Sequence, residues 1–360
     1  MSRPESERAK NLADEAWIRG LDRNGMLAIL ADSANRIRAG SALGRGFDPG
    51  PAGSVQSVLV TGLGGSAIGG EVVQSLVAGR CRVPFAVNRE YRVPAHVGKQ
   101  TLVVACSYSG NTAETLAAYH SARERQARLL AITSGGQLAA QAQRDGVPLL
   151  LIPAGSPPRT AIAYSVFPLL QILDRVGICE WSPEAAIEAE TVTARQIRQF
   201  SAESPPTANP AKQIALRLFQ KLPMIYAPSD PLGAVATRWK GQLAENSKSL
   251  ASHHLLPEML HNEIVGWEHP EWIRSAEVVF LRDAEEHPLV VAGFDFLRLR
   301  LDGVPVQVSE YRGEGISLAA RLFSLILLGD YVSAYLAFLY GEDPTPVAVI
   351  DRLKQALKGS

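Results

Sequence analysis

The sequence predicts an α/β fold made of two doubly wound domains with mainly parallel sheets. Short, fully apolar runs alternate with helix-compatible segments, which is typical of parallel strands covered on both faces. The 360 residues are enough for two domains of ordinary size. Hydrophobic residues make up 46% and charged residues 20% of the chain, the profile of a folded protein rather than a disordered one.

The first half begins with an expected helical segment, because leucine and isoleucine recur at three- and four-residue spacing from Leu12 to Ile37. A loop rich in Gly, Ser and Pro should follow over residues 39–53. Five apolar runs then predict the strands of the first sheet, at residues 58–61, 85–87, 101–106, 129–133 and 148–152.

The second half should begin after a Pro-rich polar linker at residues 201–211. Three further strands are predicted at residues 224–227, 278–281 and 305–308, and two closing helices at residues 316–340 and 346–357. We therefore expect an N-terminal helical segment (1–45), a first domain (46–200), a second domain (212–345) and a C-terminal helix (346–360).

Charge and cysteine content restrict the partners and the compartment. Basic and acidic side chains balance at 36 each, whereas nucleic-acid-binding proteins usually show a basic excess. The three cysteines form no CxxC pair, which favours a reducing compartment. The N-terminus lacks an apolar signal region, and Arg321 and Asp330 interrupt the most apolar stretch. We expect a cytoplasmic protein that binds neither nucleic acid nor membrane.

Two loops could hold a phosphate. The first follows the first predicted strand and reads GLGGSAIGG over residues 62–70; a Gly-rich turn before a helix lets backbone N–H groups approach an anion. The second follows the third strand, where Ser107, Ser109 and Thr112 cluster at a helix start. One such residue would suggest an N-cap, but three within six positions favour a phosphomonoester.

These loops resemble the phosphate loops of the sugar isomerase (SIS) domain family. The resemblance implies that Gly65, Ser66, Ser107, Ser109 and Thr112 bind the phosphate of a sugar phosphate. It also implies the fold, two SIS-type αβα sandwich domains.

Two motifs in the second half resemble the phosphoglucose/phosphomannose isomerase branch of this family. They are EN-K, beginning at Glu245, and PE..HNEI, which contains His261 sixteen positions further on. The resemblance implies that Glu245 is the proton-transfer base and that His261 opens the sugar ring from a neighbouring subunit of a homodimer. It also implies a substrate-binding Arg159 and an active-site lysine, Lys354 or the alternative Lys358, with no metal and no cofactor.

The residue types suit this chemistry. Converting an aldose phosphate to a ketose phosphate moves a proton between C2 and C1, and one carboxylate beside a cis-enediol can do both steps. Arg159 could stabilise the negative charge on the enediol oxygens. His261 has a side chain that titrates near neutral pH, as ring opening requires.

The same sequence permits other interpretations. Gly62, Gly64 and Ala67 also fit a dinucleotide fingerprint, which would indicate a nicotinamide dehydrogenase. A non-catalytic sugar-phosphate sensor is a further alternative. His253, His254, His261 and Glu263 could suggest a metal site, but histidines adjacent on a loop rarely share one metal.

Overall fold

The computed structural model describes residues 5–50, 53–269 and 275–357. This part of the chain divides into two compact units. The first unit contains Asp32–Thr191 and Gly315–Ala320. The second unit contains the chain up to Ala31, Val192–Glu314 and the chain from Arg321 onward.

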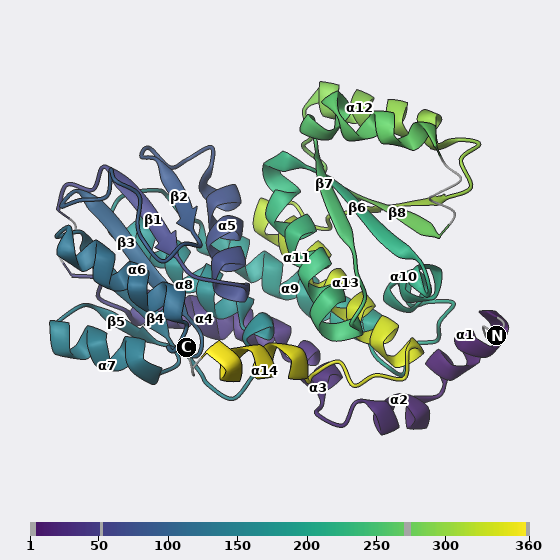
Figure 1. The fold of residues 1–360 in the computed structure, drawn as a ribbon, viewed down its shortest axis with the longest axis horizontal. Helices are drawn as coiled ribbons and strands as arrows, with labels where there is room; N and C mark the ends of the chain where they lie inside the picture. The colour runs from purple at the N-terminus through teal and green to yellow at the C-terminus, as the bar shows by residue number, and fades with distance from the viewer. Residues whose placement is uncertain (1–4, 51–52, 270–274, 358–360) are drawn as a thin grey trace. The chain divides into compact units, whose positions relative to one another are not determined.

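The first unit is built around a five-stranded sheet with strand order β2-β1-β3-β4-β5, drawn in blue in Figure 1. Every pairing in it is parallel. The strands are β1 (Ser57–Thr61), β2 (Phe85–Asn88), β3 (Thr101–Ser107), β4 (Arg128–Thr133) and β5 (Leu149–Leu151). All five coincide with the predicted apolar runs to within one or two residues.

Helices cover both faces of this sheet, as the doubly wound prediction required. Leu59 and Val103 pack against α6 (Ala113–Glu124) and α7 (Gly136–Asp145). On the opposite face, α5 (Gly65–Val77) approaches so closely that a Cβ on Gly70 would lie 2.9 Å from Val60. Beyond α5, α8 (Ile162–Arg175) packs against α4 (Ser33–Gly46), where glycines allow close contact between the helices.

The second unit is built around a four-stranded parallel sheet with strand order β7-β6-β8-β9. Its strands are β6 (Leu222–Pro228), β7 (Ser252–Leu256), β8 (Ala276–Arg282) and β9 (Gln307–Arg312). The sequence predicted β6 and β8, placed β9 too early and missed β7. The assumption that His253 and His254 lie on a loop was wrong: both belong to β7, which is only partly buried and so lacks a continuous apolar run.

Helices also cover both faces of the second sheet. One face forms a core with α12 (Pro288–Leu301), η2 (Glu258–His261) and η3 (Glu263–Glu268). The other carries α11 (Ser229–Ser247), whose Trp239 indole donates to the Leu325 carbonyl of α13 (Leu318–Leu339) at 2.8 Å. Helix α13 is long and apolar enough to cross a membrane, yet 94% of its most apolar window is buried inside the protein. It is a core helix.

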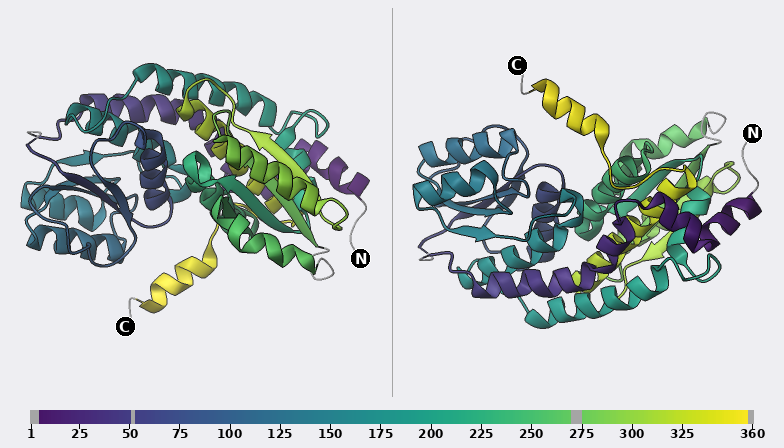
Figure 2. Two further views of the ribbon diagram at one scale, coloured as in Figure 1. Left: turned by 90° about the horizontal axis from the view of Figure 1, so that it is seen from above. Right: turned by 90° about the horizontal axis from the view of Figure 1, so that it is seen from below.

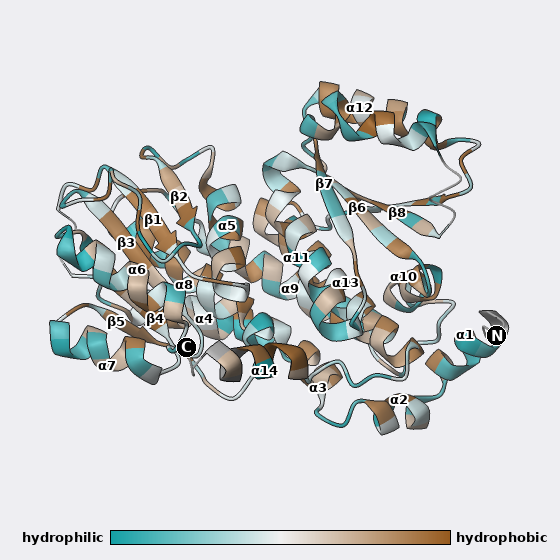
Figure 3. Ribbon diagram, in the orientation of Figure 1, coloured by the Kyte–Doolittle hydropathy of each residue, from teal (hydrophilic) through white to brown (hydrophobic). Residues whose placement is uncertain are grey.

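The remaining elements complete the chain. They are α1 (Glu5–Ala13), α2 (Glu15–Leu21), α3 (Met26–Ala31), the 3-10 helix η1 (Pro158–Thr160), α9 (Pro183–Phe200), α10 (Pro210–Leu218) and α14 (Ala348–Leu357). Within the second unit, α14 extends away from the other elements in both views of Figure 2. The ribbon is brown, and so hydrophobic, along the central strands and along α13 in Figure 3.

Candidate functional site

Both predicted phosphate loops lie at the topological switch point of the first sheet. From β1 the chain moves outward to β2, whereas β3 lies on the other side of β1 and leads to β4 and β5. In an open parallel sheet, the crevice at the carboxyl ends of such a strand pair is where ligands bind. The loop after β1 and the loop after β3 meet there, and each leads into the N-terminus of a helix.

The backbone of the first loop requires glycine at several positions. Gly64 has a φ of 54°, which favours glycine. A Cβ on Gly62 would lie 2.8 Å from the Cys106 carbonyl oxygen, at the end of β3. A Cβ on Gly69 would lie 2.2 Å from the Ser165 hydroxyl. The later glycines of the motif therefore serve helix packing, and Gly65 and Ser66 are left at the helix start where an anion could bind.

The three hydroxyls of the second loop have different surroundings. Ser107 is 2% exposed, and its Oγ lies 2.9 Å from the Thr112 hydroxyl and accepts from the Gly110 amide at 3.1 Å. Ser109 is exposed and accepts from the Asn111 amide at 3.3 Å. Thr112 is half-buried and immediately precedes α6. Ser107 thus shapes the loop from inside, while Ser109 and Thr112 lie at its surface.

Arg159 lies beside the first loop. A Cβ on Gly65 would lie 3.1 Å from the Pro158 carbonyl oxygen and 3.4 Å from the Arg159 Cα. The Arg159 side chain is only 4% exposed. Arg36 of α4 holds this segment, donating to the Thr160 carbonyl at 3.2 Å and to the Ser156 hydroxyl at 3.1 Å. The N-terminal segment therefore contributes to the site region, which its sequence did not indicate.

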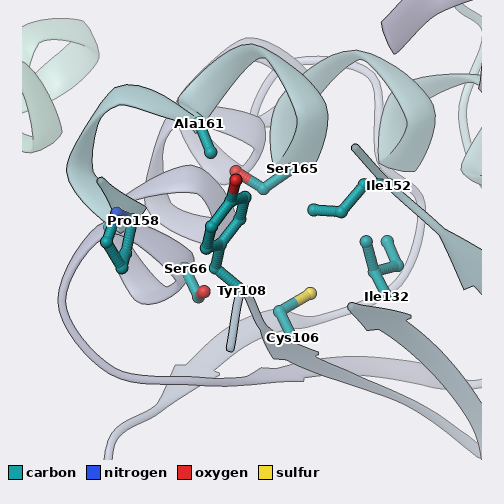
Figure 4. Close-up of a pocket in the computed structure, with 9 residues that line it drawn as sticks. Ser66, Cys106, Tyr108, Ile132, Ile152, Pro158, Ala161 and Ser165 are labelled. Atoms are coloured by element: carbon teal, nitrogen blue, oxygen red, sulfur yellow. The ribbon is translucent and has the colours of Figure 1, made fainter. Parts of the chain in front are cut away.

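A small cavity of about 10 Å³, room for about one water molecule, lies between these loops and α8 (Figure 4). Gly65 and Ser66 line it together with Tyr108, whose hydroxyl accepts from the Ser156 amide at 3.0 Å. Cys106 also lines it, and burial raises the pKa of its thiol to about 12. The thiol stays protonated at neutral pH, which argues against a nucleophilic role.

In the second unit, Glu245 lies in the last turn of α11, and its side chain is half-buried. The two other residues of the EN-K motif stabilise the end of α11 through hydrogen bonds. Asn246 is buried and donates to Ser333 Oγ at 2.9 Å. Lys248 Nζ donates to the Glu245 and Asn246 carbonyls at 3.1 and 3.0 Å, and to those of Asp343 and Pro344 at 3.0 and 3.2 Å. The EN-K motif thus presents one carboxylate on a fixed helix end.

His261 is exposed at the end of η2. Glu263 anchors the segment that follows: it accepts from the Tyr226 hydroxyl at 2.5 Å, and its other carboxylate oxygen contacts His254 Nδ1. Trp267 donates to the same hydroxyl at 3.2 Å. Burial, followed by the bond to Glu263, raises the pKa of Tyr226, which stays a protonated donor. In this arrangement Glu263 supports the loop and His261 faces solvent.

Glu245 and His261 lie beyond opposite ends of the strands of the second sheet. Helix α11 runs antiparallel to β7, because Gly233 adjoins Leu255 while Thr237 lies 3.1 Å from His253, nearer the start of the strand. Glu245 follows Thr237 by about two further turns of α11, so it lies beyond the amino ends of the strands. His261 follows the carboxyl end of β7. One copy of this unit therefore cannot bring the two side chains together.

Two predictions remain to be compared with the structure: the active-site lysine and the alternative of a metal site. Lys354 belongs to α14, but its side chain and the whole of Lys358 lie outside the described residues. Among the residues that the structure describes, no three His, Cys, Asp or Glu side chains are grouped to hold a metal.

Sequence reasoning missed Tyr108, Ser156 and Arg36, since a lone Tyr, Ser or Arg carries no recognisable spacing.

Two family models match the chain. The SIS domain matches residues 54–155, which include both phosphate loops. The bacterial phospho-glucose isomerase C-terminal SIS domain matches residues 207–357, which include Glu245 and His261. Among solved structures, a hypothetical protein from Thermus thermophilus is similar, with a TM-score of 0.71 and 17% identity over 99% of this chain and 94% of that one. At that identity the similarity establishes the fold.

Two relatives are similar over most of their length. A bifunctional phosphoglucose/phosphomannose isomerase from Caldicellulosiruptor bescii is 45% identical over 84% of this chain and 90% of its own. Its counterpart from Aquifex aeolicus is 36% identical over 84% of this chain and 91% of its own. The chain therefore belongs to the bifunctional phosphoglucose/phosphomannose isomerase family of SIS-domain enzymes.

Proposed function

We propose that this isomerase interconverts glucose 6-phosphate, mannose 6-phosphate or both with fructose 6-phosphate, in the cytoplasm and without a metal or cofactor. The observation that carries the proposal is the 45% identity to a bifunctional phosphoglucose/phosphomannose isomerase over 90% of that relative. The free thiols of Cys81, Cys106 and Cys179 agree with a reducing compartment.

The phosphate is bound by the first unit. Backbone N–H groups at Gly65 and Ser66 and the hydroxyls of Ser109 and Thr112 approach it from two helix starts, and both helix dipoles add to the attraction. Ser107 holds the second loop in shape through its buried bonds. Because the phosphate is remote from C1 and C2, its binding energy can orient the sugar for the reaction.

The proton transfer is assigned to Glu245. Its carboxylate removes the proton from C2 of the open-chain aldose, the C2–H electron pair forms the C1–C2 double bond, and the C1 carbonyl pair moves onto O1. A proton passes from the C2 hydroxyl to O1 in the cis-enediol intermediate. Glu245 then returns the carbon-bound proton to C1, and O2 becomes the ketone oxygen. Glucose and mannose phosphates share this intermediate. Arg159 and Lys354 are the cations assigned to the negative charge on the enediol oxygens.

Ring opening is assigned to His261 of a second copy in a homodimer. The separation of Glu245 and His261 at opposite sheet edges supports this assignment, because the two roles must act on one sugar. In such a dimer each site takes its base from one copy and its imidazole from the other. The imidazole passes a proton between the ring oxygen and the anomeric hydroxyl.

Glu245→Gln tests the proposal. The amide keeps the shape but cannot accept the proton, so kcat should fall by about 10²–10⁴-fold. Exchange of the C2 proton with deuterated solvent, followed by NMR, should stop while fructose 6-phosphate still binds. Undiminished turnover would remove Glu245 from the mechanism. If the unmodified protein binds fructose 6-phosphate and never converts it, the chain is a sugar-phosphate sensor instead.

A further inference from the structure

Arg159 is buried in a connection that is not held in place by the strand before it. Residues 153–155, which follow β5, are exposed, and the last of them is a glycine with a φ of 90°. Because residues 157–158 are prolines without an N–H group, the Ser156 amide is the last backbone donor that precedes Arg159. Arg159 is nevertheless only 4% exposed. Its position must therefore come from contacts that other elements make with this connection.

Hydrogen bonds from two other elements lie on either side of Arg159. On its amino side, the Ser156 amide donates to the Tyr108 hydroxyl at 3.0 Å. On its carboxyl side, the Thr160 carbonyl accepts from Arg36 Nη1 at 3.2 Å. Arg36 is 8% exposed and also donates to Ser156 Oγ at 3.1 Å. The connection is thus held between α4 and the second predicted phosphate loop, which contains Tyr108.

Tyr108 belongs to the phosphate loop through its backbone. It stands between Ser107 and Ser109, two of the predicted phosphate ligands. Its carbonyl accepts from the Ser134 amide at 3.0 Å, which fixes it against the loop after β4. Its half-buried ring lines the small cavity, and Figure 4 shows the ring extending across the cavity toward Ala161. One residue therefore contacts both the phosphate loop and the connection after β5.

The chain between Ser156 and Arg159 is short and stiff. Proline fixes its own φ near −65° and restricts the residue before it to extended conformations. Two prolines follow Ser156, and the second of them begins η1, which contains Arg159. A shift of Ser156 therefore moves the backbone of Arg159, because few rotations between the two residues can absorb it.

We propose that Tyr108 is a positioning residue, whose hydroxyl holds the Ser156 amide and so makes the position of Arg159 depend on the phosphate loop. A sugar phosphate bound at this loop stabilises Tyr108 and, through Ser156, Arg159. Tyr108 acts through Arg159 and not on the reacting carbons. The catalytic consequence rests on the proposed function, in which Arg159 stabilises the enediol oxygens. The bond itself rests on the geometry of the two segments.

Tyr108→Phe tests the catalytic consequence, because it removes the hydroxyl and keeps the ring. A displaced arginine stabilises the transition state less well, so kcat should fall about tenfold while KM for fructose 6-phosphate changes by less than about twofold. Tyr119→Phe is the matched control. The Tyr119 hydroxyl also makes a hydrogen bond within the first unit, to Asp145 at 3.0 Å, and its loss should change neither kcat nor KM.

A double variant tests whether Tyr108 acts through Arg159. In an Arg159→Met background the hydroxyl has no guanidinium to position, so Tyr108→Phe should lower kcat no further. An undiminished effect of Tyr108→Phe in that background overturns the proposal. A Tyr108→Phe variant whose KM rises at unchanged kcat also overturns it, because the hydroxyl would then serve only the shape of the phosphate loop.

Hydrogen exchange tests the bond without relying on activity. Mass spectrometry of the peptide over residues 153–161 should show exchange that is about tenfold slower when fructose 6-phosphate is bound, because the ligand stabilises the loop that holds Ser156. Tyr108→Phe should abolish this protection, and protection that persists in the variant overturns the proposed bond. The proposed function fails separately: if the protection is lost in Tyr108→Phe but Arg159→Met keeps full kcat, the bond stands and the catalytic assignment of Arg159 does not.

Discussion

The two sheets of this protein share one topology but place their functional residues differently. In the first unit, the predicted ligand-binding residues gather at the carboxyl edge of the sheet, at the switch point between β1 and β3. In the second unit, Glu245 lies beyond the amino edge and His261 beyond the carboxyl edge. The first sheet brings its predicted ligand-binding residues together at one end of its strands, whereas the second holds Glu245 and His261 apart. Under the proposed function, a single topology therefore serves both a phosphate site within one copy and a catalytic site shared between two copies.

The prediction with the largest expected effect tests whether Glu245 of one copy and His261 of another act in one catalytic site. Glu245→Gln and His261→Asn should each be nearly inactive. When the two variants are mixed and allowed to exchange subunits, half of the dimers contain one of each, and one of their two sites has both native groups. Activity should therefore rise to about a quarter of the unmodified level, as statistical pairing requires.

Each variant passed through the same exchange alone is the control for this experiment. A mixture as inactive as its components would show that Glu245 and His261 act within one chain. The comparison between the two sheets would then lose its functional meaning.

The second prediction concerns a buried carboxyl in the second sheet only. Glu277 of β8 is 1% exposed, and among the described residues neither of its carboxylate oxygens has a hydrogen-bond partner. Burial raises its pKa to about 7, against the lowering effect of Lys221 and Arg217. The folded state therefore holds the proton more tightly than the unfolded state, and the free energy of unfolding should fall as pH rises from about 4.5 to about 7.

Glu277→Gln should remove this slope and stabilise the second unit by about 2–3 kcal/mol at pH 8, with little change at pH 4.5. Urea unfolding at both pH values measures it. Glu342→Gln, at an exposed site in the same unit, should leave the slope unchanged. An unaltered slope in Glu277→Gln would assign the pH dependence to other groups.

The third prediction concerns the end of α11. Lys248→Met removes the ammonium that donates to four carbonyl oxygens, which should lower the free energy of unfolding by about 1–2 kcal/mol. Because the same bonds hold the Glu245 turn, kcat should fall more than KM rises. Lys240→Met, exposed on the same helix, should change neither quantity. Equal losses in both variants would mean that Lys248 contributes only its charge.

The smallest expected effect belongs to the first sheet. Thr112→Val keeps the shape of the side chain and removes a hydroxyl at the rim of the phosphate site, so the Kd for fructose 6-phosphate should rise about tenfold. Isothermal titration calorimetry measures it, with Thr191→Val, exposed in the same unit, as the control. An unchanged Kd would leave Thr112 outside the phosphate site.

The first sheet could be predicted almost completely from the sequence. Its central strands are buried on both faces, so they appear as continuous apolar runs such as 101–106, and the Gly-rich turn and hydroxyl cluster follow directly in the chain. The strand β7 could not be predicted in this way. It is partly buried along its length and carries His253 and His254, so neither an apolar run nor a strict alternation marks it.

The sequence by itself determined the α/β class, the position of both predicted phosphate loops between a strand and a helix, and the family to which the chain belongs, because local patterns and motifs carry that information. Only the tertiary structure decided that Ser107 is buried while Ser109 and Thr112 lie at the surface, and that Arg36 supports the loop of Arg159. It also decided that Glu245 and His261 stand at opposite sheet edges. These are relations between segments distant in the chain, and burial and strand direction arise only when the helices and strands pack.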